Sequence, residues 1–321
     1  MAELSSLSHA RYGKDKVRVL RVVREGSWHH VVEYSVQALL EGDIDVSYTK
    51  ADNSVVVATD SVKNITYYLA KTSPHILNPE RFALHLGTHL VSKYAHIHKA
   101  FVTIEQLRWT RIPVETDGQS EPHAHSFYRD GEDKRIVKVE VDATAGKNQI
   151  VGKVTAGIND LLILKSTGSA FTNFVRDEYT TLVEVDDRIF STSVDLSYTF
   201  GQFNIPAPKD EKKLDFVVPK AEPGSIWDVE VPEKARKVTL ETFATDDSAS
   251  VQATLYKMAQ QIIADNSGIQ SVTYTLPNKH YVPVDMKYIG VDNITPLTEA
   301  EVFTPLAAPS GLISATISRK Q

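Results

Sequence analysis

The strongest constraint on the fold is one order of patterns that occurs in both halves of the chain. Residues 16–24 and 30–40 alternate apolar and polar side chains, as half-buried strands do. A helical stripe and two further strands follow, and the second half gives strand, strand, helix, strand and strand again. Hairpin-linked strands pair antiparallel, and the helices would cover one face of each sheet. We therefore expect an α+β fold, although no sequence identity between the halves proves a duplication.

Helices are predicted where apolar side chains recur every three or four residues. The first begins near Thr59-Asp60, with Ser61 also available as a cap. The second follows Pro79-Glu80. The three apolar stripes are Val62, Ile65 and Leu69; Phe82, Leu86, Leu90 and Tyr94; and Val251, Leu255, Met258 and Ile262.

The remaining apolar segments are predicted to be strands. A turn or bulge is expected at Glu41-Gly42, and a loop rich in Gly, Pro and His precedes residue 135. The further strands are expected at 54–58, 100–111, 135–142, 149–154, 160–165, 193–200, 236–243, 269–275 and 280–288. A linker contains Pro206, Pro208, Pro219 and Pro223. The 321 residues divide into two expected domains, 1–146 and 147–321.

Composition excludes several classes of chemistry. The absence of cysteine excludes disulfides, thiolate catalysis and iron–sulfur ligation. A formal charge of −6 argues against a nucleic-acid partner, and the lack of an 18-residue apolar run argues against a membrane span. The N-terminal segment lacks the apolar core of a signal peptide, so we expect the chain inside the cell or inside an organelle that it enters folded.

The histidines and the candidate base each have two interpretations. His85 and His89 have metal-binding spacing on a helix, and His123 and His125 form a second pair. Without a zincin pattern we interpret all four as surface or interface histidines and expect no metal. Lys14 beside Asp15 is either a solvated pair or, with its pKa lowered by its surroundings, a base.

The start of the helix at Thr59-Asp60 is either a simple cap or an anion site, and both interpretations can hold together. Arg188, Gln252 and the segment Asn278-Lys279-His280 are uninformative when each is taken alone. No phosphate loop, Rossmann, haem or flavin fingerprint is present. An oxidoreductase of this sequence would therefore work without the usual cofactors. Long strands with open edges also favour pairing between subunits.

Taken together, six segments in order resemble the uricase family over residues 11–317. The most diagnostic is LLILKSTGSAFTNFVRDEYTTL at 161–182, and residues 47–61 look most like the fungal branch. The other segments are YGKD at 12–15, ADNSVVVATDSVKNITYYLAK at 51–71, DRIFST at 187–192, SASVQATLYKMA at 248–259 and LPNKHY at 276–281. The resemblance implies two tandem tunnelling-fold domains, a barrel closed by two chains, and a homotetramer of two stacked barrels.

The resemblance also implies a role for each matching residue. Arg188 and Gln252 would hold the planar urate anion in its plane, and Phe171 would stack on the purine ring. The N–H of Val251 would add a contact. Thr59 and Asp60 would contact the opposite edge of the ring from a neighbouring subunit.

A proton relay is implied in addition, formed by Lys14, Thr59 and His280, in which Lys14 acts through the Thr59 hydroxyl. Asn278, with Thr59, would hold dioxygen or the attacking water. The implied reaction converts urate, dioxygen and water into 5-hydroxyisourate and hydrogen peroxide without a cofactor.

Location and the competing functions are also expectations. Eukaryotic members of the family often carry a peroxisomal tripeptide of the Ser-Lys-Leu type, which the ending Ser318-Arg319-Lys320-Gln321 does not match. Peroxisomal location is thus expected from the family and unsupported by this terminus. The alternatives are another tunnelling-fold enzyme acting on a purine or pterin, and a non-catalytic binding protein. Zinc content would identify the first, and a lost relay residue the second; all three relay residues are present.

Overall fold

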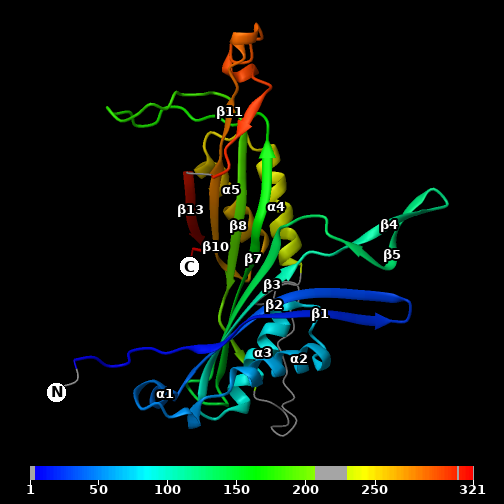
Figure 1. The fold of residues 1–321 in the computed structure, drawn as a ribbon, viewed down its shortest axis with the longest axis vertical. Coiled ribbons are helices and arrows are strands. Elements are labelled where there is room, and N and C mark those ends of the chain that lie inside the picture. The colour runs from blue at the N-terminus through cyan, green and yellow to red at the C-terminus, as the bar shows by residue number, and fades with distance from the viewer. Residues whose placement is uncertain (1–3, 207–229, 309–310, 321) are drawn as a thin grey trace. The chain divides into compact units, whose positions relative to one another are not determined.

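The structure is a computed structural model that describes residues 4–206, 230–308 and 311–320. The chain divides into two compact units (Figure 1). Unit 1 comprises Met1–Gly157 and Thr199–Glu222, and unit 2 comprises Ile158–Tyr198 and Pro223–Gln321. The predicted division after residue 146 stays a prediction. No helix of the described ranges is both long and apolar enough to cross a membrane.

Unit 1 is an antiparallel sheet with helices packed on it. Its strands pair in the order β1-β2-β3-β6, followed by the first half of β7, which also pairs with β9. The predicted bulge at Glu41-Gly42 is confirmed by a register shift between β2 and β3. The strands are β1 (Tyr12–Glu25), β2 (Trp28–Gly42), β3 (Ile97–Leu107), β6 (Lys134–Asp142), β7 (Ile150–Lys165) and β9 (Phe203–Ile205).

The helices of unit 1 are held by the apolar stripes that the sequence shows. Helix α2 (Thr59–Thr72) packs on β1, and α3 (Pro79–Lys93) packs on β3 and β6. Phe82, Leu86 and Leu90 are fully buried. A Cβ at Gly87 would lie 2.7 Å from Cγ2 of Val141, so only glycine lets α3 approach the sheet this closely. The short helices α1 (Asp45–Thr49) and η1 (Asn53–Val55) precede α2.

Unit 2 repeats this arrangement. The second half of β7 is followed in the sheet order by β8 (Phe190–Phe200), β10 (Ile269–Lys279) and β13 (Gly311–Ser318). Helix α5 (Val251–Asp265) packs on β10 and β13 through its fully buried stripe, with α4 (Val231–Thr245) beside it. The remaining elements are β11 (Tyr281–Pro283), η2 (Lys287–Ile289), η3 (Leu297–Glu299) and β12 (Phe303–Pro305).

The two units share a constant spacing along their helical layers. The starts of α2 and α4 (59 and 231), of α3 and α5 (79 and 251) and of β3 and β10 (97 and 269) are each 172 residues apart. Each unit also has one basic side chain that donates to backbone carbonyls between its second helix and the strand that follows. The Nζ of Lys147 donates to the carbonyls of residues 91, 94 and 97, and the guanidinium of Arg319 donates to those of residues 263, 266 and 269. This equal spacing supports the internal repeat that the sequence patterns suggest.

One predicted strand is a helix. Residues 236–243 were expected to be a strand, but they lie within α4. The buried side chains of this helix include Ala235, Val238, Thr239 and Phe243, which share one helical face. With this correction the main sheet and its helices follow one order twice along the chain, as β1, β2, α2, α3, β3 and β6 and then as β7, β8, α4, α5, β10 and β13.

Other boundaries differ from the prediction. Residues 54–58 form the end of η1 and an extended stretch rather than a strand, with the N–H of Val57 bonded to the Tyr12 hydroxyl. Residues 149–154 and 160–165 belong to one strand, β7, in which Asp160 has a left-handed φ of 62°. The predicted strand at 280–288 is reduced to β11.

The sequence interpretation also missed five strands, among them β9. The loop before residue 135 is the hairpin β4 (Thr110–Thr116) and β5 (Gln119–Tyr128), which extends away from the helices of unit 1 (Figure 1). Strands β12 and β13 were missed as well. Pro206 follows β9, while Pro208, Pro219 and Pro223 of the predicted linker lie outside the described residues.

Candidate functional site

The first group of predicted site residues lies at the start of α2 in unit 1. The position before the helix is Ala58, whose side chain cannot cap, so Thr59 and Asp60 are the first two helical residues. The interpretation of this segment as a side-chain cap is therefore wrong. The N–H groups of a first turn have no partner within their helix, and the helix dipole adds positive potential there. This end of α2 suits an anionic ligand.

Lys14 lies beside this helix start. The Tyr12 hydroxyl accepts a hydrogen bond of 2.7 Å from the N–H of Val57, which ties the beginning of β1 to the segment that enters α2. Lys63, hydrogen-bonded to Asp60 at 2.6 Å, lowers the pKa of that exposed carboxyl most, and the charge of Lys14 lowers it further. Lys14, Thr59 and Asp60 thus meet in one part of unit 1.

A β-bulge sets the direction of Lys14. The pairing of β1 with β2 shifts register between Lys14 and Val17, and Lys16 has a φ of 54°. A Cβ at Gly13 would lie 2.0 Å from the carbonyl oxygen of Ala38, so the strands are in close contact just before the bulge. Bulges of this kind redirect side chains near functional sites.

The second group lies in unit 2, where Phe171 and Arg188 are neighbours. The backbones of Phe171 and Val185 exchange two hydrogen bonds, of 2.8 and 3.1 Å. The Cζ of Arg188 lies 5.2 Å from the centre of the Phe171 ring, and Phe174 stacks on that ring at 4.9 Å. Burial lowers the pKa of Arg188, yet an arginine stays charged at neutral pH. A half-buried cation beside a partly exposed aromatic ring suits a flat anion.

Val251 and Gln252 begin α5. The side chain of Ser250 accepts from the N–H of Ala253 at 3.1 Å, so the cap uses the third residue of the helix and not the first two. Val251 is buried and Gln252 is exposed. Ser248, just before this helix, exchanges backbone hydrogen bonds with Gly168 and Ala170 of the loop that leads to Phe171. The segments that carry Phe171, Arg188 and Gln252 are therefore linked by their backbones.

Asn278 and His280 lie together at the end of β10. Asn278 pairs with Gly311 of β13. A Cβ at Gly311 would lie 3.4 Å from the Cβ of Asn278 and 3.8 Å from Nε2 of His280. Both side chains thus border one backbone position, which a larger residue would crowd.

The structure therefore gathers the predicted residues into a set in unit 1 and two sets in unit 2. Sequence reasoning missed two side chains that hold them: Tyr12, which anchors the approach to α2, and Asp187, which binds the loop before Phe171. Both stand inside segments that it had singled out, YGKD and DRIFST. Their adjacency to Lys14 and Arg188 was the available signal.

The histidines expected at the surface are partly in the core. His85 and His89 are 9% and 6% exposed on α3, and His85 is hydrogen-bonded to the Ser73 hydroxyl at 2.8 Å. Their burial follows from the packing of α3 on the sheet. His123 and His125 lie on the β4–β5 hairpin with ring centres 4.5 Å apart. The described ranges hold no group of three His, Asp or Glu side chains placed for a metal ion.

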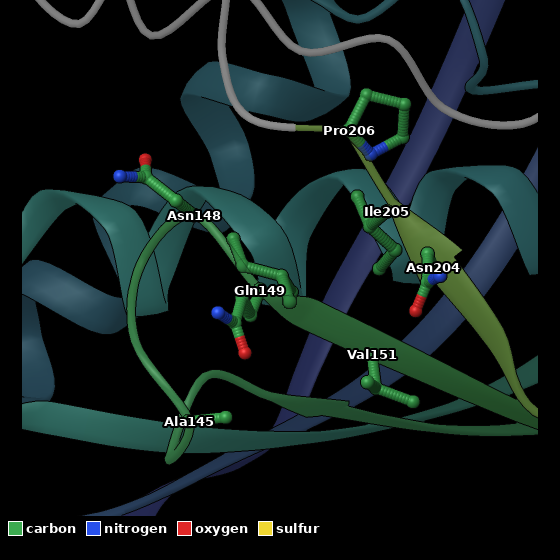
Figure 2. A pocket seen from close by; sticks show the side chains of 8 residues that line it. Ala145, Asn148, Gln149, Val151, Asn204, Ile205 and Pro206 are labelled. Atoms are coloured by element: carbon green, nitrogen blue, oxygen red, sulfur yellow. The ribbon is translucent and has the colours of Figure 1, made fainter.

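No predicted site residue lines any of three hollows in the described residues, and two of these hollows bear on where an anion could bind. Figure 2 shows one in unit 1, of about 480 Å³, between Gln149 before β7 and Asn204 of β9; none of the predicted site residues lines it. The other, in unit 2, has a volume of about 460 Å³ and is lined partly by Asp186, Asp187 and Asp247. Three carboxylates disfavour an anion there.

The geometry defines an α+β protein of two repeated units that offers an open helix start in each unit, with groups suited to a flat anion. A family model described as uricase matches residues 10–140 and 154–314. The chain belongs to the uricase family.

Relatives and solved structures agree with this assignment. The chain is 47% identical to the uricases of Emericella nidulans over 320 residues and of Aspergillus flavus over 319, and 43% identical to that of Schizosaccharomyces pombe over 322. In each case the alignment covers at least 98% of both chains. The crystal structure of uricase from Arthrobacter globiformis superposes with a TM-score of 0.80 at 31% identity, covering 98% of this chain and 96% of that one. The fold expected from the resemblance is thereby confirmed.

Proposed function

We propose that this chain is a urate oxidase that converts urate, dioxygen and water into 5-hydroxyisourate and hydrogen peroxide without a cofactor. The observation that carries the proposal is the uricase match over nearly the whole chain, which spans the positions of every residue expected for the site. The two open helix starts and the Phe171–Arg188 pair supply the kinds of group that a flat, anionic purine requires.

Binding is assigned to unit 2. The Arg188 guanidinium and the Gln252 amide would hold the edge of urate, because a planar donor fork and a donor–acceptor amide match its alternating oxygens and nitrogens. Phe171 would stack on the ring, and the N–H of Val251 would donate from the start of α5. Partial burial of Arg188 would strengthen its attraction to the anion.

Proton transfer is assigned to the set in unit 1 together with His280. Lys14 would take a proton of urate through the Thr59 hydroxyl, because a threonine alone is far too weak a base. The more electron-rich urate could then give an electron directly to dioxygen held by Asn278 and Thr59. Bonding at C5 would give a hydroperoxide, and water would replace peroxide there. The protein supplies the base, the face-to-face placement and stabilisation of developing charge.

The direct experiment mixes metal-stripped protein with urate in aerated buffer. We expect loss of urate absorbance together with one hydrogen peroxide for each urate consumed. A folded protein that consumes no urate would refute the proposal. The alternative enzyme would then be tested by screening pterins and measuring zinc, and a protein that turns over neither class would indicate a binding function.

We also propose that the site is completed between chains of a homotetramer, with Thr59 and Asp60 reaching urate bound by another copy. Co-expression of Lys14→Met chains with Arg188→Gln chains tests this arrangement. If each site combines two chains, some sites receive both intact halves, and activity recovers above that of either variant alone. Absence of recovery in a hybrid of confirmed mass would place both halves in one chain. Peroxisomal location is proposed from the family only, and imaging of the untagged protein would test it.

A further inference from the structure

The loop before Phe171 is the common link of the binding set in unit 2. On one side, Phe171 exchanges two backbone hydrogen bonds with Val185, three residues before Arg188. On the other, the carbonyl of Gly168 accepts from the N–H of Ser248, and the N–H of Ala170 donates to the carbonyl of Ser248, at 3.0 and 2.8 Å. A shift of residues 167–171 would therefore move the ring relative to both of its proposed partners.

One side chain holds this loop at three points. The Asp187 carboxylate accepts from the Thr167 hydroxyl at 2.5 Å, from the N–H of Gly168 at 2.8 Å and from the N–H of Ser169 at 3.3 Å. Gly168 has a φ of 77°, which favours glycine and gives the loop little intrinsic preference for this path. The carboxylate supplies the constraint that the loop sequence lacks.

The charged form of Asp187 is stabilised by these bonds. Partial burial alone would raise the pKa of its carboxyl, but hydrogen bonds from Thr167, Ser169, Gly168 and the backbone of Arg188 outweigh burial and lower that pKa. Asp187 is therefore an anion at neutral pH and holds the three donors with charge-assisted bonds.

We infer that Asp187 is a positioning residue that fixes the Phe171 ring against Arg188 and so sets the affinity for urate. This inference rests on the proposed function and extends it to a residue with no assigned role in binding. Asp187 does not touch the proposed ligand. It acts on substrate binding and not on the proton relay, because its hydrogen bonds go to the loop that carries the ring and to the backbone of Arg188, both of which belong to the binding set.

Three variants separate this role from a general effect on folding. Asp187→Ala removes the three contacts to the loop and the contact with the Arg188 backbone, and Asp187→Asn keeps one carbonyl oxygen that can accept from Gly168. Asp186→Asn is the matched control, since Asp186 is the adjacent exposed carboxylate. Urate binding is measured without dioxygen, where no turnover occurs, and KM and kcat are measured in aerated buffer.

We expect the dissociation constant of urate to rise roughly tenfold or more in Asp187→Ala, less in Asp187→Asn, and not at all in Asp186→Asn. KM should rise by more than kcat falls. An unchanged dissociation constant in Asp187→Ala, or a fall in kcat alone, would overturn the inference. Equal losses in Asp187→Asn and Asp187→Ala would also overturn it, because the retained acceptor would then have no effect.

A readout without urate separates this inference from the proposed function. Hydrogen exchange of the amides of residues 168–171 should be faster in Asp187→Ala and unchanged in Asp186→Asn. If the wild-type protein neither binds nor oxidises urate, the proposed function fails, and the affinity part of the inference fails with it. Unchanged exchange in Asp187→Ala refutes the positioning role whether or not urate is the substrate.

Discussion

The two units use equivalent helix starts in opposite ways. In unit 1, α2 begins with Thr59 and Asp60 and has no side-chain cap, whereas α3 begins with Pro79, which has no N–H. In unit 2 the assignment is reversed. Helix α4 begins with Val231-Pro232, and α5 begins with Val251 and the exposed Gln252. Each unit therefore has proline in the first turn of one helix, and leaves the first two N–H groups of its other helix, α2 or α5, without a side-chain cap.

The second positions of α3 and α5 show the difference most directly. Glu80 and Gln252 are 172 residues apart and occupy the same place in their helices. Glu80 is 3% exposed and accepts two hydrogen bonds of 2.6 Å from Arg135, whereas Gln252 is exposed. One structural position thus holds a unit together in the first half and presents an exposed amide in the second, where we propose that it binds urate. Repetition of a fold leaves equivalent positions free to differ in purpose.

The largest expected effect tests the chemical role of unit 1. Lys14→Met removes the amine and keeps the length of the side chain, so turnover should fall by about 10²- to 10⁴-fold. Anaerobic urate binding should stay within about threefold of wild type, because binding is assigned to unit 2. Steady-state kinetics and calorimetry measure the two effects. Turnover within a few fold of wild type would remove Lys14 from the relay.

Glu80→Ala tests the structural role of the equivalent position. It removes the buried carboxylate that accepts two hydrogen bonds from the partly exposed Arg135, and the free energy of unfolding should fall by about 1.5–3 kcal/mol. Gln252→Ala should change stability by less than about 0.5 kcal/mol while weakening urate binding. Denaturant titration with matched binding data measures both. Equal losses of stability in the two variants would show that positions 80 and 252 have the same structural role.

Acid should weaken unit 1 in particular. Burial lowers the pKa of His75 to about 4, with Arg81 and His85 adding to the effect, and burial lowers that of His89 to about 4, with His85 and Lys93 adding. The folded state then binds fewer protons than the unfolded state between pH 6.5 and 4. The stabilisation is complete above pH 6.5 and is lost as the pH falls toward 4, by a few kcal/mol in all.

Urea titrations across this pH window measure how steeply the free energy of unfolding falls with pH. A double variant, His75→Gln with His89→Gln, should flatten this slope, and the exposed His9→Gln should not. The positions of unit 2 equivalent to His75 and His89 are Asp247 and Gln261, so unit 2 has no histidine at either place. Hydrogen exchange at acidic pH should therefore rise first in unit 1. A slope that persists in the double variant would assign the acid sensitivity to other groups.

The smallest expected effect concerns the open start of α2. Ala58→Ser supplies the missing cap and should raise the free energy of unfolding by about 0.5–1 kcal/mol. The new hydroxyl would occupy N–H groups that we assign to urate, so KM should rise. Calorimetry and initial rates measure the two changes. A more stable variant with an unchanged KM would show that the α2 start does not contact the substrate.

Sequence reasoning predicted the elements whose patterns are unambiguous. The four-residue stripe of α3 and the offsets along α5 admit only a helix. It failed on α4, where Val238 and Leu240 alternate as in a strand and the helical face is carried partly by Ala235 and Thr239. Tertiary packing decides such segments.

Ordered motifs in the sequence predicted the site residues, and only the folded structure shows the contacts around them. The motifs identify Thr59 and Asp60, but they do not show that α2 begins at Thr59 without a side-chain cap. The motifs likewise identify Arg188, but they do not show the three hydrogen bonds by which Asp187 holds the loop before Phe171. Contacts between segments far apart in the sequence depend on the fold, and a single sequence does not record them.

The hydrogen bonds of Arg319 determine where a tag or a fusion partner can be attached near the end of this sequence. Its guanidinium binds the carbonyls of Ile263, Asn266 and Ile269, and its N–H donates to the carbonyl of Gln270. A purification tag or fusion partner joined upstream of Arg319 would leave three carbonyls, between the last turn of α5 and the start of β10, without their donor. A linker attached after Arg319 leaves that corner intact, so the point of attachment decides whether a labelled protein behaves as the native one does.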